Sequence, residues 1–159
     1  MTKLWKGHNY QLTAVSFLLS NPCSGLFLDP GLGKTATSLQ TIKILKNARK
    51  IGGVLMIAPL RVTQSVWPNE IKKWANFNSL SCTILHGNSK PTLWSKSDIY
   101  LINPEGLPWL YQELLTGLQN KKKCPFNTLW IDESTKFKTF NSKRLELLID
   151  MLPLFKRRP

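Results

Sequence analysis

The sequence is short of acidic residues, of cysteines and of long apolar runs, and each shortage rules out a class of protein. Only 9 aspartates and glutamates stand against 22 lysines and arginines, so the net charge is +13. A chain this basic favours a polyanionic partner, and because no basic amphipathic helix stands out, nucleic acid fits better than a membrane surface. No apolar run is long enough to span a bilayer, and the first residues lack the apolar core of a signal peptide.

The three cysteines, Cys23, Cys82 and Cys124, lie far apart, with no Cys-x-x-Cys pair and no pair of histidines nearby. This spacing argues against a zinc site or a disulfide framework and indicates reduced structural thiols. We therefore expect an intracellular protein without a membrane partner. It would be cytoplasmic in a bacterial or phage-infected host and nuclear in a eukaryote.

The length and the order of apolar segments predict one α/β domain. The chain has 159 residues, of which 42% are hydrophobic and 19% charged, and it contains no internal repeat. Nearly unbroken apolar runs alternate with helical patterns, which predicts a parallel sheet with helices on both faces. The expected strands are residues 25–28, 54–59, 81–87, 98–104 and 126–134, and the expected helices are residues 10–20, 34–45, 62–75, 108–118 and 142–152.

Several local features of these helices follow from residue chemistry. We expect Asn9 to cap the first helix, the third to break or restart at Pro68, and the fourth to stop near Gly117. Lys46, just beyond the end of the second helix, is expected to stay in water. The side chains expected to face the core are Leu12, Val15, Phe17, Leu18, Leu19, Leu39, Ile42, Leu45, Val66, Ile71 and Trp74. Core or interface anchors are expected at Trp67, Trp74, Trp94 and Trp109.

The segment Gly25–Thr35, GLFLDPGLGKT, joins a short apolar run to a glycine-rich turn and the start of a helix. This order suits a phosphate-binding loop (P-loop), because Gly31 and Gly33 allow backbone N–H groups to approach phosphate oxygens. Lys34 would reach the β- and γ-phosphates, and Thr35 would offer its hydroxyl to Mg²⁺. The start of the helix adds a positive dipole end facing the anion.

The strict pattern G-x-x-x-x-G-K-[ST] is not met, because Leu28 stands where its first glycine would be. Taken alone, the loop therefore leaves open a simple tight connection between two elements.

A second motif, Leu129–Glu133, is an apolar run that ends in two adjacent carboxylates. A Mg²⁺·ATP site needs one carboxylate to hold the metal and another to orient or deprotonate the attacking water. We assign Asp132 to the metal and Glu133 to the water, and count Lys34 with them as catalytic. A solvated turn at a strand end is the alternative. Both motifs follow strands at the carboxyl edge of the expected sheet, where ligands bind in such folds.

With these motifs in order, the sequence resembles the helicase superfamily two ATPases, closest to the Swi/Snf-like double-stranded DNA translocases. The resemblance covers essentially the whole chain. Two departures are Pro30, where methionine is usual, and Thr135, where histidine is common. The segments that carry the resemblance are Tyr10-Gln11 (Q motif), residues 29–35 (the P-loop), residues 58–61 with Trp67, Glu70 and Lys73-Trp74 (motif Ia and its helix), residues 85–87, residues 103–107, and residues 132–135 (the Asp-Glu-x-His box).

This resemblance implies a RecA-like P-loop NTPase lobe spanning residues 1–159, with residues 1–9 as a lead-in. Its cofactors would be ATP and Mg²⁺, and its partner duplex DNA more than RNA. It implies nucleotide contacts at Gln11, which would read the adenine edge, and at Gly31, Leu32, Gly33, Lys34, Thr35 and Ala36. Metal ligands would be Thr35 and Asp132, and DNA phosphates would contact Arg61, Thr63, Lys136 and Lys138.

The resemblance also implies a second RecA-like lobe, absent from this chain, that supplies arginine fingers. We therefore expect ATP binding with little hydrolysis by residues 1–159 alone, since such an arginine is worth a factor of about 10³ to 10⁵. Two other functions stay open at this point. In the first, the chain is a turnover-deficient stand-alone module that binds nucleic acid or a helicase partner. In the second, it is a small-molecule kinase, but the sequence shows no lid segment for one, and a kinase of this kind would not explain the net charge of +13.

Overall fold

A four-stranded parallel sheet forms the centre of the computed structural model, which describes residues 2–26, 31–87, 93–132 and 142–155. All three neighbouring pairs are parallel, and the strand order is β2-β3-β1-β4. The strands are β1 (Val54–Ile57), β2 (Cys82–Ile84), β3 (Ile99–Ile102) and β4 (Thr128–Ile131). The expected parallel sheet is thus confirmed.

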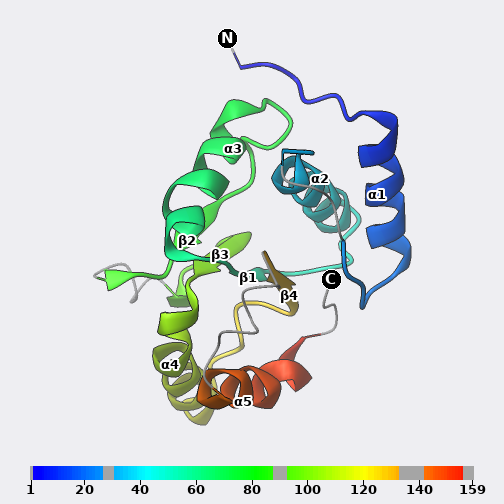
Figure 1. The fold of residues 1–159 in the computed structure, drawn as a ribbon. Coiled ribbons are helices and arrows are strands. Elements are labelled where there is room, and N and C mark those ends of the chain that lie inside the picture. Colours follow the sequence, from blue (N-terminus) through cyan, green and yellow to red (C-terminus); the bar gives the residue numbers. More distant parts are fainter. Residues whose placement is uncertain (1, 27–30, 88–92, 133–141, 156–159) are drawn as a thin grey trace.

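The helices connect these strands and lie in two layers. They are α1 (Asn9–Ser20), α2 (Lys34–Asn47), α3 (Trp67–Lys73), α4 (Leu107–Gln119) and α5 (Ser142–Met151). A π-helical turn, η1 (Val62–Val66), precedes α3, and the 3₁₀ turns η3 (Pro104–Gly106) and η5 (Leu152–Leu154) adjoin α4 and α5. Figure 1 shows α1, α2 and α3 on one side of the sheet and α4 and α5 on the other.

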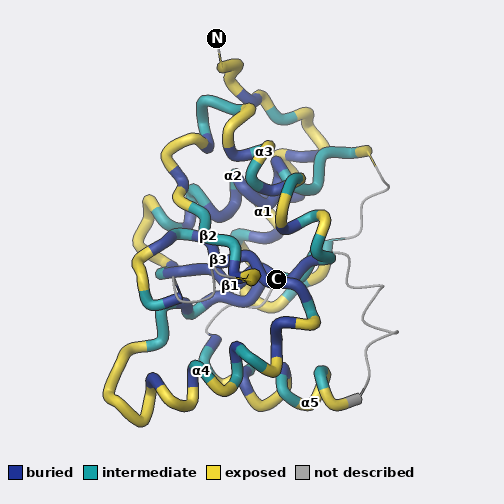
Figure 2. Tube along the Cα trace, turned by 90° about the vertical axis from the view of Figure 1, so that its left-hand side faces the viewer, coloured by how far each residue is buried: buried dark blue, intermediate teal, exposed yellow. Residues whose placement is uncertain are grey.

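Alternation along β1 divides the core into two clusters. Val54 and Met56 pack with α2 and α3 on one face, while Leu55 and Ile57 pack with α4 and α5 on the other. Successive strand residues point to opposite faces, so a strand covered on both sides must be apolar throughout. All four β1 residues are buried, as the dark tube at the centre of Figure 2 shows. Helices on both faces are therefore confirmed.

The expected strand at residues 25–28 is not found in the described part of the chain. Gly25 and Leu26 lie outside any strand, and residues 27–28 are outside the described residues. An apolar run becomes a strand only when a neighbour takes up its backbone hydrogen bonds, and among the described residues β4 has a strand partner on one side only. The other strands are present but shorter than the apolar runs that predicted them.

The first helix starts one residue earlier than expected, and its cap is His8, not Asn9. The side chain of Gln11 accepts a hydrogen bond from the His8 backbone N–H at 2.9 Å, which completes a capping box. Leu12 and Phe17 are 48% and 45% exposed, against our expectation. Because α1 packs on α2 in an outer layer, only a narrow stripe of it reaches the core.

The helical segment after β1 restarts next to Pro68, as expected, because the π turn η1 ends at Val66 and α3 begins at Trp67. The backbone N–H of Trp67 bonds the carbonyl of Val62, five residues earlier, and Pro68 then sits in the first turn of α3. Proline has no N–H to donate, so it is tolerated where a wide turn or a helix start leaves that bond unmade. Val66 is 37% exposed rather than inward, since the π turn shifts the buried stripe to Thr63 and Trp67.

Two helices end one or two residues beyond their expected limits. The helix α4 begins at Leu107 and runs past Gly117 to Gln119. Gly117 is there because the ring of Trp94 packs directly on its Cα, where a Cβ would collide. The helix α2 extends to Asn47, with Leu39, Ile42 and Leu45 buried as expected.

The N-terminal lead-in is docked, which the sequence did not indicate. The Ala75 backbone N–H bonds the Lys3 carbonyl at 2.9 Å, and the Trp5 N–H bonds Oδ1 of Asn76 at 2.8 Å. Trp5 is 8% exposed and packs on Phe77, with ring centroids 5.8 Å apart. Trp5 is therefore part of the core that covers the α3 side of the sheet, while Lys3 and Leu4 stay exposed.

Candidate functional site

The glycine-rich turn leads directly into the first turn of α2. Gly31 and Gly33 have φ angles of +86° and +76°, in the left-handed region that favours glycine. Gly33 is the N-cap residue of α2, and its carbonyl accepts the backbone N–H of Thr37 at 3.0 Å. The first N–H groups of a helix have no partner within the helix, so this end suits an anion. Lys34 and Thr35 are half-buried there, and Ala36 is buried.

Gln11 holds this turn in place. Its Nε2 donates to the Leu32 carbonyl at 3.0 Å, while its Oε1 accepts from the His8 N–H. The Tyr10 hydroxyl donates to the same Leu32 oxygen at 3.4 Å. Gln11 is 5% exposed, and a Cβ on Gly33 would collide with its amide. Gln11, which was expected to read the adenine edge, therefore supports the loop. A Gln at the third position after the cap could have signalled its bond to His8 but not its bond to Leu32.

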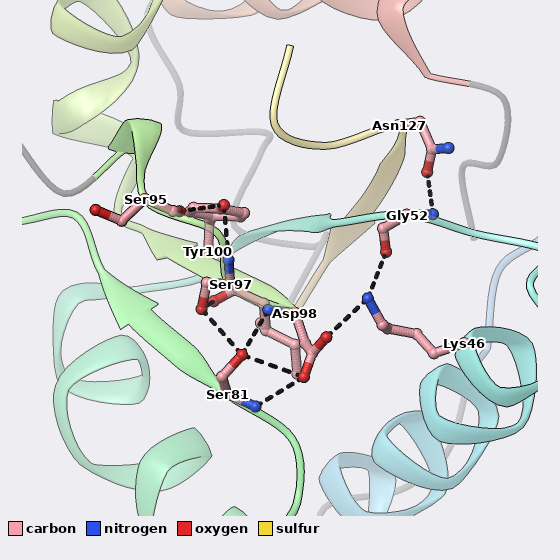
Figure 3. Close-up of polar contacts among 9 residues, drawn as sticks. Lys46, Gly52, Ser81, Ser95, Ser97, Asp98, Tyr100 and Asn127 are labelled. Carbon is pink, nitrogen blue, oxygen red and sulfur yellow. Dashed lines mark hydrogen bonds and ion pairs between the residues drawn. The ribbon is translucent and has the colours of Figure 1, made fainter. Parts of the chain in front are cut away.

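The far end of α2 is tied to the amino edge of the sheet. Nζ of Lys46 lies 2.7 Å from Oδ1 of Asp98 and 3.3 Å from the Gly52 carbonyl, as Figure 3 shows. Gly52 and Asp98 come just before β1 and β3. Lys46 is thus half-buried and paired, not solvated as expected.

This contact sets the direction of α2. A helix of 14 residues is about 21 Å long, and α2 packs along the sheet through Leu39, Ile42 and Leu45. With its last turn at the amino edge, its first turn is directed toward the carboxyl edge, where Asp132 directly follows β4.

Asp98 is the centre of the amino-edge contacts. The backbone N–H and the hydroxyl of Ser81 donate to its Oδ2 at 2.9 and 3.1 Å. Burial raises the pKa of Asp98, but the hydrogen bonds from Lys46 and Ser81 and the charge of Lys46 outweigh it and lower the pKa below its usual value. The carboxylate therefore stays ionised and joins α2 to the starts of β2 and β3.

Asp132 is fixed at the opposite edge by two contacts. Its backbone N–H bonds the Ile57 carbonyl at 2.9 Å, which extends the pairing of β4 with β1. Its Oδ2 accepts the indole N–H of Trp67 at 3.0 Å. Trp67 is 1% exposed, so the expectation of a core anchor is confirmed, but its bond to Asp132 was missed. Glu133 lies outside the described residues.

The residues after β1 differ in what they present to solvent. Arg61 is exposed, and its carbonyl accepts the Ser65 hydroxyl at 2.8 Å. Thr63 is 1% exposed, and its hydroxyl donates to the Leu60 carbonyl at 2.7 Å. Of this pair, only Arg61 offers its side chain to a phosphate. Lys136 and Lys138 are outside the described residues.

The donor atoms available at the carboxyl edge fit a hard cation. Mg²⁺ binds oxygen ligands and keeps several waters, so one carboxylate and one hydroxyl, here Asp132 and Thr35, suffice beside phosphate oxygens. Within residues 2–26, 31–87, 93–132 and 142–155, no cluster of three His, Cys, Asp or Glu forms a separate metal site. No helix in that part of the chain has the length and apolar character needed to cross a membrane.

Burial raises the pKa of the Cys82 and Cys124 thiols, while Cys23 is exposed. Cys82 and Cys124 are therefore held in the protonated form at neutral pH, as befits structural residues.

The sequence matches a known family and several known proteins. The profile of the SNF2-related domain matches residues 10–157. The protein p41 of Acyrthosiphon pisum secondary endosymbiont phage 1 is 29% identical over 140 residues, which cover 85% of this chain and 29% of p41. The ATP-dependent DNA helicase DDM1 of Arabidopsis thaliana is 31% identical over 150 residues, which cover 88% of this chain and 19% of DDM1.

A solved structure has the same fold. The Sulfolobus solfataricus SWI2/SNF2 ATPase core in complex with dsDNA superposes with a TM-score of 0.68 at 22% identity, covering 92% of this chain and 30% of that one. At this identity the likeness shows the RecA-like fold alone. This chain spans less than a third of the length of each of these relatives.

Proposed function

Since the chain belongs to the SNF2-related domain family, as a helicase-like ATPase domain, we propose that it is the ATP-binding lobe of a Swi/Snf-like DNA translocase. The observation that carries this proposal is the arrangement of α2. Its glycine-capped start is directed toward the edge where Asp132 follows β4, because Lys46 ties its other end to the amino edge. One nucleotide with its metal would then contact both.

Different residues of this edge would bind different parts of Mg²⁺·ATP. Gly31, Leu32, Gly33 and Ala36 would present backbone N–H groups to the phosphates, and Lys34 would add a point charge. Thr35 and Asp132 would hold the ion, which when bound neutralises charge on the phosphate oxygens. Glu133 would orient the attacking water. Gln11 would face the adenine edge while its contact with Leu32 keeps the loop in place.

The proposed partner is duplex DNA, bound through its backbone without reading of sequence. Support comes from the net charge of +13 and from the exposed Arg61 just beyond the end of β1. Lys136 and Lys138 would add phosphate contacts, while Thr63 would shape the turn that carries Arg61. The similar Sulfolobus core was solved in complex with dsDNA, which favours DNA over RNA.

We expect residues 1–159 alone to bind ATP and hydrolyse little of it. In the proposed mechanism an arginine from a second lobe stabilises the transition state, an effect of about 10³- to 10⁵-fold. The relatives are more than three times as long as the matched segment, which leaves room in them for such a lobe.

The test is ATP affinity in the presence of Mg²⁺ for the wild type and for Lys34→Ala and Asp132→Ala. Each variant removes a charged contact, and we expect a loss of about tenfold to a hundredfold, the equivalent of one charge-assisted hydrogen bond. Lys43→Ala, on the same helix but away from its start, is the matched control and should bind as the wild type does. Equal affinity in the wild type and both site variants would rule out the proposal.

A further inference from the structure

Trp67 is the partner of the Asp132 carboxylate. Its Nε1–H donates to Oδ2 of Asp132 at 3.0 Å across 65 residues of sequence. Among the described residues, no other side chain hydrogen-bonds this carboxylate. The indole is 1% exposed and packed in the core that covers the α3 side of the sheet, so its N–H direction is fixed by the surrounding side chains.

The π-helical turn explains why Trp67 faces Asp132. Helical backbone starts at Leu60, and in a regular α-helix each residue turns by about 100°. The wider turn η1 takes up one additional residue, which its bond from the Trp67 N–H to the Val62 carbonyl marks. Trp67 and Ile71 thereby share the buried side of α3, and the indole reaches the end of β4. Turns of this kind occur often at functional sites.

We propose that Trp67 is a positioning residue that holds Oδ2 of Asp132 and so leaves Oδ1 as the oxygen directed to Mg²⁺. This inference rests on the proposed function and extends it to a residue that would touch neither nucleotide nor metal. Partners that hydrogen-bond a metal-ligating carboxylate set its orientation, and their loss typically lowers metal affinity by about 10- to 100-fold. If Trp67 had only a structural role, its N–H would still need a hydrogen-bond partner, but its replacement would not lower the affinity for Mg²⁺·ATP more than the affinity for metal-free ATP.

The experiment compares ATP affinity with Mg²⁺ and with EDTA for the full chain and for Trp67→Phe. The substitution keeps an aromatic ring and removes the N–H donor. We expect the affinity for Mg²⁺·ATP to fall by about tenfold or more, while the affinity for metal-free ATP stays within about twofold. Trp5→Phe is the matched control, because Trp5 lies in the same core cluster and its ring packs on Phe77 without contacting Asp132.

An equal loss in both conditions, or no loss in either, would overturn this inference. A wild type whose ATP affinity does not depend on Mg²⁺ would instead contradict the proposed function itself. If Trp67→Phe does not fold, the indole N–H resonance of Trp67 in the wild type decides. It should shift when Mg²⁺ is added to the ATP-bound chain while that of Trp5 does not, and an unchanged Trp67 resonance overturns the inference.

Discussion

Lys46 and Asp98 illustrate how one pair of side chains fixes the C-terminal end of α2. Lys46 follows a helical pattern rich in polar residues and carries no sign of burial in the sequence, yet it spans from α2 to the starts of β1 and β3. Both side chains are about one-fifth exposed, at 22% and 23%, so solvent screens the pair only in part. We therefore expect the pair to stabilise the fold measurably.

Asp98→Asn should lower the free energy of unfolding at neutral pH by about 1–2 kcal/mol, since it weakens charge-assisted hydrogen bonds from Lys46 and Ser81. The pKa of Asp98 is lower in the folded chain than in the unfolded one. Its contribution is therefore complete above about pH 4 and is lost as the pH falls through the lower, folded pKa.

Urea denaturation at a series of pH values measures this effect. The difference between wild type and Asp98→Asn should shrink below about pH 4. Asp150→Asn, which changes an exposed acid on α5, serves as the control. A difference that stays constant as the pH is lowered would show that the charge of Asp98 does not stabilise the fold.

Among the elements, α4 and the η1–α3 segment show helices that tertiary contacts extend or reshape. Gly117 has a low helix propensity, yet α4 continues past it to Gln119. The ring of Trp94 fills the space that a side chain at position 117 would occupy. Pro68 would break a helix, but the π turn before it removes the conflict and directs Trp67 to Asp132. Packing thus offsets the low helix propensity of Gly117, about 1 kcal/mol, whereas Pro68 avoids a penalty because it lies in the first turn of α3.

Gly117→Ala tests which of the two effects is larger in α4. Alanine raises helix propensity by about 1 kcal/mol, whereas forcing a methyl group against Trp94 costs about 1–3 kcal/mol. Because the Cβ would meet a large ring rather than a flexible chain end, we expect net destabilisation of about 1–2 kcal/mol in urea denaturation. Thr116→Ala, at an exposed neighbouring position, should be neutral or stabilising. A more stable Gly117→Ala would mean that Trp94 moves aside easily.

For the molecule as a whole, positive charge and sheet polarity act together. The net charge of +13 would attract DNA over the whole surface. Two exposed cations lie at opposite edges of the sheet: Arg61 just beyond the carboxyl end of β1, and Lys50 after the end of α2 that is tied to the amino edge. The proposed DNA path follows the carboxyl edge, so the two cations should differ in their effect on binding.

Arg61→Ala should weaken binding of duplex DNA uniformly across sequences. It should also reduce the slope of log affinity against log salt concentration by about 1, as expected for the loss of one phosphate contact. Lys50→Ala, the control at the amino edge, should leave the slope close to that of the wild type. Fluorescence anisotropy titrations over a range of salt concentrations measure both. Equal changes in the two variants would argue for diffuse attraction instead of a defined path.

The sequence by itself determined the α/β class, four of the strands, the start of α2 at Lys34 and the family resemblance. These follow from short-range patterns, because apolar runs, glycines and helical periodicity act through neighbouring residues. The tertiary structure decided that Trp67 meets Asp132, that Lys46 meets Asp98, and that Gln11 supports the turn at Leu32. Such partners are distant in sequence and are brought together by the strand order β2-β3-β1-β4 and by packing against it, which no local pattern encodes.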